Sequence, residues 1–204
     1  PDFINSNGRG RYNADQLVGM KKGFISGWNI SDETFVGVHS DQTWWSHYNS
    51  NGVTISGIFD VAFKLPPVPS GTYEIRFGYT ANADRGVVQA YLNNEPCGIP
   101  IDLRVGGWDA SVGWKPDTDD EEENRANDKA MHNRGFMKGM DCYRQWTGSP
   151  LREITNNLRR VLATRYLDSE QTYTLRLRQV LDDPNCYLSF DYIELCPKSV
   201  YGSP

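Results

Sequence analysis

The chain has 204 residues, a formal net charge of −5 and a hydrophobic fraction of 38%, which is ordinary for a globular protein. This acidic balance argues against nucleic acid as a partner, because a protein that follows a phosphate backbone needs a basic stripe. No apolar run approaches the roughly 20 residues of a membrane-spanning helix, and the length fits one large all-β domain or two small ones.

The first thirty residues are rich in turn formers and show little hydrophobic periodicity. We therefore expect residues 1–30 to be an entry segment or linker, and residues 31–204 to form a single domain. The chain begins at Pro1 without Met or an apolar leader, so we expect it to be a piece of a longer protein.

Alternation of apolar and polar residues then predicts a series of strands. Every second residue from Val53 to Leu65 is apolar or Gly, which predicts one long strand with a bend near Gly57. Thr72–Tyr79 places Tyr73, Ile75, Phe77 and Tyr79 on one face and Thr72, Glu74, Arg76 and Gly78 on the other. This pattern predicts a half-buried strand whose polar face meets water. Val87–Leu92 follows, and Asn93-Asn94 predicts a tight turn.

The periodicity is lost between Arg104 and Pro150, so we expect a long irregular loop inserted in the domain at 104–150. This segment contains Trp108, Trp114 and Trp146. Its acidic run, Asp117–Glu123, is typical of a solvated and mobile surface segment.

The last part of the chain predicts three more strands. They are 158–167, after a short turn or helix at 150–156, then Thr172–Val180, and finally Cys186–Leu195, whose apolar residues on both faces indicate a central position. Many short strands separated by turn signals predict an all-β fold, a jelly-roll β-sandwich of two antiparallel sheets.

The four cysteines show no spacing typical of a zinc site. Cys186 and Cys196 bracket one continuous strand, so they lie too far apart to form a disulfide with each other. Two alternatives stay open: buried thiols, or a long-range bridge such as Cys97–Cys142.

Two segments carry a resemblance to known families. SGTYEIRFGYTANADRGVVQAYLN together with TYTLRLRQVLDDPNCYLSFDYIEL resembles the galactose-binding-like jelly roll of carbohydrate-binding module families 6 and 35. The longer string from Leu65 to Arg104, with HNRGFMKGMDCYR and the closing DYIEL, is similar to the uncharacterised domain that follows fasciclin domains in surface lipoproteins of Bacteroidetes.

This resemblance implies a non-catalytic binding module at the cell surface, outside the cytoplasm, with carbohydrate or protein as its partner. It implies no cofactor other than a structural calcium ion, for which Asp191 matches the ligand position in the last strand.

The predicted loop holds the candidate ligand-binding residues. A sugar ring stacks its apolar face on Trp or Tyr, and its hydroxyls bond to Asn, Asp and Arg side chains. Residues of these types lie together in the insertion: Trp108, Trp114, Trp146, Asn133, Arg134 and Asp141. The alternative is that the three Trp side chains only anchor the loop on the sandwich.

Two other functions were weighed against carbohydrate binding. One is a structural or protein-interaction domain attached to a fasciclin-like adhesion domain. The other is an enzyme such as a glycoside hydrolase, which the sequence disfavours, because it lacks a nucleophile elbow and its clustered carboxylates make a poor acid/base pair.

Overall fold

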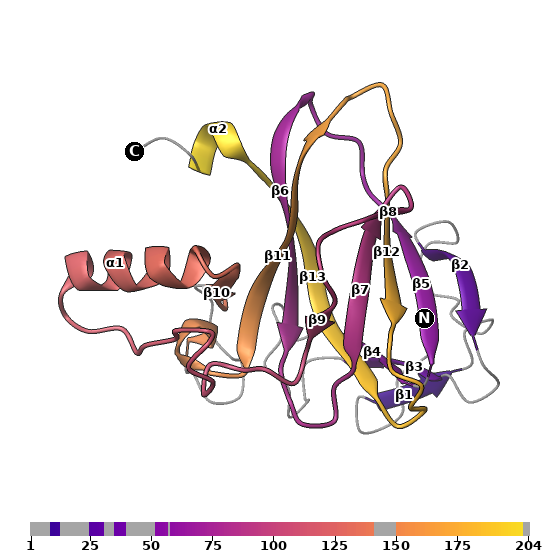
Figure 1. Cartoon of the computed structure of the whole chain (residues 1–204), viewed down its shortest axis with the longest axis horizontal. Coiled ribbons are helices and arrows are strands. Elements are labelled where there is room, and N and C mark those ends of the chain that lie inside the picture. Colours follow the sequence, from indigo (N-terminus) through magenta and orange to yellow (C-terminus); the bar gives the residue numbers. More distant parts are fainter. Residues whose placement is uncertain are drawn as a thin grey trace.

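The structure is a computed structural model. It describes the backbone of residues 9–12, 25–30, 35–39, 52–56, 58–140 and 150–201, and the side chains of residues 58–140, 150–189 and 192–199. Strands in this part of the chain form two antiparallel sheets that face each other (Figure 1), which confirms the predicted all-β sandwich.

Sheet A contains the strands that position the site. Its order is β1 (Arg9–Tyr12), β3 (Phe35–His39), β4 (Gly52–Ser56), β13 (Tyr187–Pro197), β6 (Gly71–Thr80), β11 (Asn157–Leu167) and β10 (Phe136–Lys138). Sheet B has the order β2 (Ile25–Ile30), β5 (Phe59–Lys64), β12 (Thr174–Gln179), β7 (Val87–Leu92) and β8 (Glu95–Pro96), and β9 (Ile101–Asp102) also pairs with β7.

The predicted boundary at residue 30 does not separate the strands. β1 pairs with β3, and β2 pairs with β5, so residues from the expected entry segment add strands to both sheets.

The predicted long strand Val53–Leu65 is two strands in two different sheets. β4 pairs with β13 in sheet A, whereas β5 pairs with β12 in sheet B. The alternation therefore predicts the strands but not the crossing between the two sheets. Phe59, Val61 and Phe63 of β5 are buried between the sheets.

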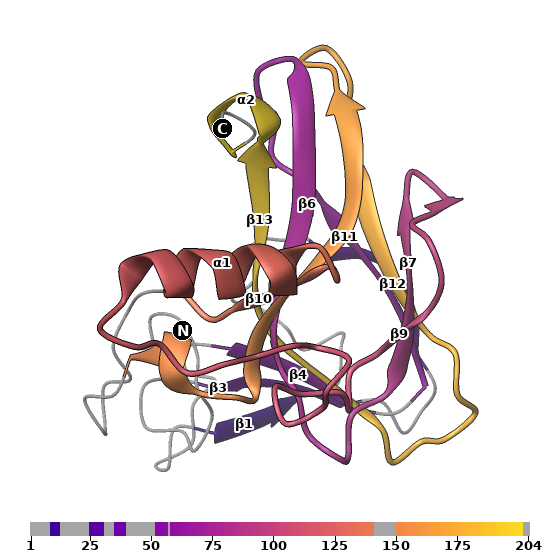
Figure 2. The same cartoon turned by 60° about the vertical axis from the view of Figure 1, so that its left-hand side comes forward.

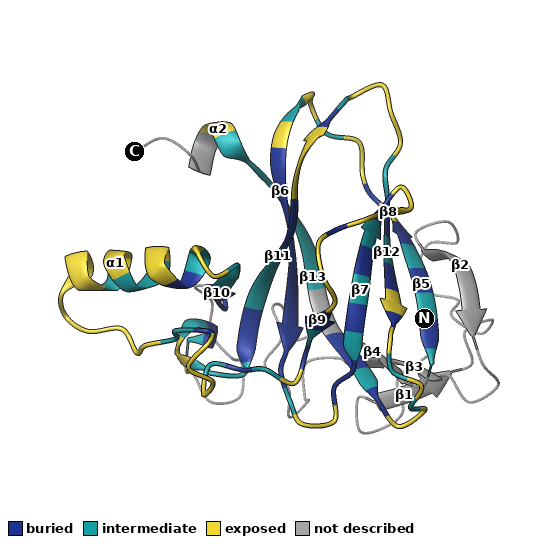
Figure 3. Ribbon diagram, viewed as in Figure 1, coloured by how far each residue is buried: buried dark blue, intermediate teal, exposed yellow. Residues whose placement is uncertain are grey.

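The core lies between the sheets and is apolar. Alternate residues of β6 and β12 point into it, including Ile75, Phe77, Leu175 and Leu177, none more than 2% exposed. Figure 3 shows this buried interior along β5, β6, β7 and β12. Each such side chain contributes roughly 1.5–3 kcal/mol by leaving water, so alternation with an apolar face is enough to fix which face turns inward.

The β7–β8 turn agrees with its sequence. Asn93 and Asn94 both have positive φ, 47° and 69°, a conformation that Asn tolerates and that suits the twist of a two-residue hairpin. Asn93 Oδ1 also accepts a hydrogen bond from the Thr174 amide at 2.8 Å, which ties the turn to β12.

β13 is central, as predicted, because it lies between β4 and β6. Its register shifts between Phe190 and Tyr192, and such a bulge reverses which parity points inward. Leu188 before the bulge is fully buried, and Ile193 and Leu195 after it pack against the same core. The bulge therefore explains the apolar residues on both parities.

The insertion 104–150 is more regular than predicted. It contains α1 (Glu121–His132) and β10, and the 3-10 helix η3 (Leu151–Glu153) follows it. The acidic run Asp117–Glu123 leads into α1, because Asp120 caps the helix and Glu121–Glu123 form its first turn. The Asp120 carboxylate accepts hydrogen bonds from the amides of Glu122 and Glu123, at 2.9 and 3.1 Å. Acidic side chains in a first helical turn are also favoured by the helix dipole.

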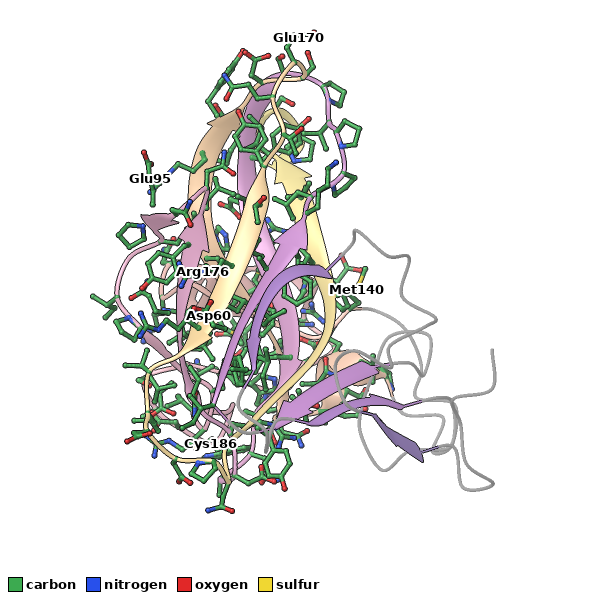
Figure 4. All side chains as sticks on the ribbon, turned by 90° about the vertical axis from the view of Figure 1, so that its right-hand side faces the viewer. Asp60, Glu95, Met140, Glu170, Arg176 and Cys186 are labelled. Carbon is green, nitrogen blue, oxygen red and sulfur yellow. The ribbon has the colours of Figure 1, made fainter. Side chains whose placement is uncertain are left out.

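The two outer faces of the sandwich differ. The C-terminal end of α1 meets sheet A at β10 and, through His132, at Glu74 of β6. The helix extends away from the sheet in Figure 1, so it passes in front of the strands when that side is turned forward in Figure 2. The outer face of sheet B is turned to the viewer in Figure 4, where Arg176 and Asp60 lie side by side. Arg176 Nε donates to Asp60 Oδ1 at 2.5 Å, and Nη2 donates to Oδ2.

The polar face of β6 is not wet, contrary to the prediction. Glu74 and Arg76 are 4% and 2% exposed, because His132 of α1, Lys198 of the short helix α2 (Lys198–Tyr201) and Tyr192 of β13 lie against that face. A charged residue is buried only when it is paired, and here each has a partner of opposite sign.

Candidate functional site

The candidate site is built on the loop between β9 and α1, which we call the Trp108 loop and define as residues 104–114. Two successive turns fold it. The Asp109 amide donates to the Gly106 carbonyl at 2.9 Å, and the Val112 amide donates to the Asp109 carbonyl at 3.1 Å. Val112 is fully buried and fixes the loop on the core.

Two carboxylates, one just before this loop and one in its middle, are occupied by their neighbours. Asp102 accepts from the Arg104 amide at 3.0 Å and from its guanidinium at 2.8 and 2.6 Å. Asp109 accepts from the Ser111 amide and hydroxyl at 2.8 and 2.6 Å. The bonds from Arg104 lower the pKa of Asp102, and those from Ser111 lower the pKa of Asp109. Both carboxyls are therefore charged at neutral pH.

Trp108 presents its indole to solvent. It is 58% exposed, and its ring lies over Gly106, whose missing side chain makes the space. A Cβ at Gly106 would stand 2.4 Å from Trp108 Cη2. An exposed flat ring with one face supported by backbone has the form of a stacking platform.

Trp114 fits the alternative interpretation of the tryptophans, in which the side chain anchors the loop on the sandwich. It is half-buried, packs against the core cluster, and lies beside Gly107. The Lys138 ammonium is 5.5 Å from the centre of its ring, within the range of a cation–π interaction. Trp114 therefore lies where an anchor of the loop would lie.

Asn133 and Arg134 follow directly after α1. The Asn133 amide donates to the carbonyl of Lys129 at 3.0 Å and so closes the helix. The side chain of Arg134 is exposed, and its guanidinium lies over the backbone of the Trp108 loop. Arg134 Nη1 is 1.7 Å from the place of a Cβ on Gly113, which has φ +73°. The structure thus brings Arg134 and Trp108 to the same loop.

Three predicted site residues cannot be placed in this geometry. Trp146 and Asp141 lie outside the described residues. Asp191 belongs to β13, but its side chain also lies outside the described part. Among the side chains that the structure describes, no group of three or more His, Cys, Asp or Glu residues is placed to hold a metal ion. The calcium ion stays a prediction.

A cluster of four charged side chains holds the insertion together; we call it the α1 clamp. Lys138 Nζ donates to Asp117 Oδ1 at 2.5 Å, and Arg152 donates to Asp117 at 2.5 and 3.1 Å. Arg152 also pairs with Asp128 of α1. Burial alone raises the pKa of Asp117, but the bonds from Arg152 and Lys138 outweigh it and lower that pKa. The clamp joins the end of the Trp108 loop to α1, β10 and η3.

A second network lies on the outer face of sheet A. Arg76 donates to Glu74 and, at 2.9 Å, to Glu194; Arg159 donates to the other oxygen of Glu194 at 3.2 Å. His132 Nε2 is 3.1 Å from Glu74 Oε2, and Lys198 Nζ is 3.4 Å from Glu74 Oε1. These contacts attach the C-terminal end of α1, through His132, and the start of α2, through Lys198, to Glu74 of β6.

Sequence reasoning missed Arg160, which lies beside Arg134. Arg160 Nη1 donates to the Arg134 carbonyl at 2.7 Å, and its guanidinium is 4.0 Å from the centre of the Phe136 ring. The available signal was the run Leu158–Val161, where two arginines interrupt an apolar strand. Its position near the loop depends on the β10–β11 pairing, which no local pattern shows.

The three cysteines in the described part of the chain are thiols. Cys97, Cys186 and Cys196 are free, and the first two are buried. Cys142, the other half of the bridge considered above, lies outside the described residues. Burial raises the pKa of the Cys97 thiol, which is typical of an inert structural cysteine.

The fold and the loop together define a two-sheet β-sandwich whose insertion displays an aromatic platform beside exposed cationic side chains. No protein-family model and no curated protein matches the chain. One similar solved structure is a xanthan lyase from Paenibacillus, with a TM-score of 0.48 and 14% identity. The alignment covers 97% of this chain and 14% of the lyase chain. At this level the similarity carries no argument about function. Within the described part of the chain, no helix is long and apolar enough to cross a membrane.

Proposed function

We propose that this chain is a non-catalytic carbohydrate-binding module that works outside the cytoplasm. The observation that supports this function best is Trp108, which is 58% exposed on a loop that is otherwise anchored by buried side chains. An exposed aromatic ring offers a free face on which a sugar ring can stack, whereas the buried rings are occupied by the core.

The surroundings of Trp108 supply what a sugar needs in addition to a stacking surface. Arg134 is exposed against the same loop, and its guanidinium offers donors for hydroxyl groups. The loop is already folded by its own hydrogen bonds and by the α1 clamp. A preformed site loses little conformational entropy on binding, which favours affinity without a large contact area.

A non-catalytic role agrees with the state of the nearby carboxyls. Glycoside hydrolysis needs one carboxylic acid with a raised pKa, beside a second that is charged. The pKa of Asp102 and the pKa of Asp109 are both lowered by their hydrogen bonds to Arg104 and Ser111. Neither side chain is suited to donate a proton to a leaving group.

We further propose that the module belongs to the galactose-binding-like sandwiches of the type found in carbohydrate-binding module families 6 and 35, in a protein with fasciclin domains. The two-sheet sandwich and the central place of the closing strand support this assignment. The alternative, a structural or protein-interaction domain, predicts no saccharide ligand.

The test is titration of the chain with a panel of soluble plant, bacterial and algal polysaccharides by isothermal calorimetry. We expect at least one member to bind, and Trp108→Ala to weaken that binding by about 2 kcal/mol or more, roughly 30-fold in Kd. Tyr166→Ala is the matched control, because Tyr166 is an equally exposed aromatic residue, 64%, on β11 outside the loop. Absence of binding across the panel would overturn the proposal.

A further inference from the structure

Two neighbouring arginines beside the Trp108 loop lack a carboxylate partner among the described side chains. The guanidinium of Arg134 is exposed and lies over Gly113. Arg160 gives one hydrogen bond to the Arg134 carbonyl, and its Nε is buried with no hydrogen-bond partner in the described part of the chain. Burial lowers the pKa of Arg160, and no carboxylate offsets this effect.

This arrangement differs from that of other buried or half-buried arginines in the described part of the chain. Arg76, Arg152, Arg159 and Arg176 each bind at least one carboxylate, at 3.2 Å or less. A partly desolvated guanidinium gains most from a charged acceptor, so Arg160 has an unmet requirement that the same fold satisfies elsewhere. The guanidinium of Arg134 beside it is exposed to an acceptor from solvent.

Five charged side chains on or beside the loop bear on this question: Arg104, Arg134, Arg160, Asp102 and Asp109. Asp102 already binds Arg104, and Asp109 already binds Ser111. The charge left without a partner is therefore that of Arg134 and Arg160.

The arginines and the platform lie within reach of one ligand. The Trp108 ring lies over Gly106, and the Arg134 guanidinium lies over Gly113. The chain makes two consecutive turns, from Gly106 to Asp109 and from Asp109 to Val112, and Gly113 is the next residue. A β-turn brings its end Cα atoms within about 7 Å, so the two glycines are at most about 18 Å apart. A short oligosaccharide spans such a distance.

We propose that the saccharide bound on the Trp108 loop carries an acidic group, a carboxylate or a sulfate, and that Arg134 binds this group directly. This inference rests on the proposed function and deepens it by naming the ligand's chemical class. Trp108 stacks on a sugar ring, Arg134 forms the charge-assisted hydrogen bonds, and Arg160 positions Arg134 through its carbonyl and adds positive charge.

Matched pairs of polysaccharides test the proposal. Polygalacturonate is compared with its methyl-esterified form, and a sulfated galactan with its desulfated form, by calorimetry at 20 and 300 mM NaCl and with and without EDTA. We expect one acidic member to bind at least about 10-fold more tightly than its neutral form, since a hydrogen bond to a charged group contributes about 1.5–3 kcal/mol. This preference should weaken with salt and survive EDTA, because guanidinium groups and not a metal ion hold the acid.

Variants separate the roles of the side chains. Arg134→Gln should raise the Kd for the acidic member at least 10-fold and leave the Kd for its neutral form unchanged. Arg160→Gln should reduce the same preference, and Arg160→Lys should restore part of it. Arg165→Gln is the control, because Arg165 is exposed on the same strand and donates only to the adjacent Thr164 carbonyl among the described residues.

The outcomes distinguish this inference from the proposed function. Equal Kd values for acidic and neutral forms, with loss of both in Trp108→Ala, would overturn the acidic-group inference and leave carbohydrate binding in place. Loss of the acidic preference in EDTA would also overturn it. No binding to any polysaccharide would overturn both.

Discussion

Arg76 places two of its nitrogens on one oxygen of Glu74: Nε donates to Oε2 at 3.0 Å and Nη2 donates to the same atom at 2.8 Å. The side chains are 3% and 5% exposed, although they come from the strand face that alternation assigns to water. The covering layer of His132, Lys198 and Tyr192 turns a surface pattern into an interior ion pair.

This pair should be important for stability because one partner cannot remain charged and buried alone. Glu74→Gln keeps the size of the side chain but removes the charge facing Arg76, His132 and Lys198. We expect the free energy of unfolding to fall by about 3–5 kcal/mol, as for other broken buried pairs. Urea denaturation followed by circular dichroism measures it. Glu95→Gln, at an exposed position, should change stability by less than about 0.5 kcal/mol.

Acid should destabilise the protein through the same carboxyl. Burial raises the pKa of Glu74, but the hydrogen bonds from Arg76 and His132 outweigh it, so the net shift from the ordinary value of 4.5 is downward. A depressed carboxyl pKa contributes stability that is complete above the unfolded pKa and is lost as pH falls through the folded pKa. Unfolding free energy should therefore decline below about pH 4.5. Glu74→Gln should make this decline shallower, and an unchanged slope would contradict the assignment.

The α1 clamp should hold the insertion without contributing to the core. Lys138→Met keeps the alkyl chain but leaves Asp117 and Asp128 with Arg152 as their remaining described cation. Because Asp117 is 27% exposed, we expect a loss of only about 1–3 kcal/mol. Limited proteolysis should show faster cleavage within 104–140 than in the sheets. Lys64→Met, at an exposed position in β5, serves as the control. Equal rates of cleavage within 104–140 in the two variants would show that the clamp is dispensable.

The two adjacent glycines of the loop should respond differently to a methyl group. At Gly106 a Cβ meets the exposed Trp108 ring, which has room to swing away. At Gly107 it meets the Thr155 carbonyl oxygen at 2.7 Å and the half-buried Trp114. We expect Gly106→Ala to weaken saccharide binding with nearly unchanged stability, and Gly107→Ala to cost about 1–3 kcal/mol of stability. Calorimetric titration and urea denaturation of both variants check the contrast; the reverse order would mean that the Trp108 ring is not free to move.

Removal of a core side chain gives the reference for these effects. Leu175 of β12 is fully buried between the sheets, so Leu175→Ala should lower the free energy of unfolding by about 2–5 kcal/mol. Val180→Ala, just beyond the same strand and 50% exposed, should have a far smaller effect. Similar losses for the two variants would mean that β12 does not face the core.

The sequence alone was sufficient for the elements whose local pattern and final environment agree. β7, β12, the apolar face of β6 and the Asn93-Asn94 turn follow from alternation and turn chemistry, since burial of one apolar face dominates their free energy. The chemical types gathered in the insertion were also visible, and Trp108 and Arg134 were among the residues singled out for a ligand.

Tertiary structure decided the rest, because alternation records which side chains are apolar and not which strand lies beside them. It split 53–65 between two sheets, reversed the inward parity of β13 at a bulge, and buried Glu74 and Arg76 where His132, Lys198 and Tyr192 meet β6. It also placed Trp108 in solvent and Trp114 against the core, and it brought Arg160 of β11 beside Arg134 through the pairing of β10 with β11. Contacts between residues distant in sequence determine these features, and such contacts leave no periodic trace in a single chain.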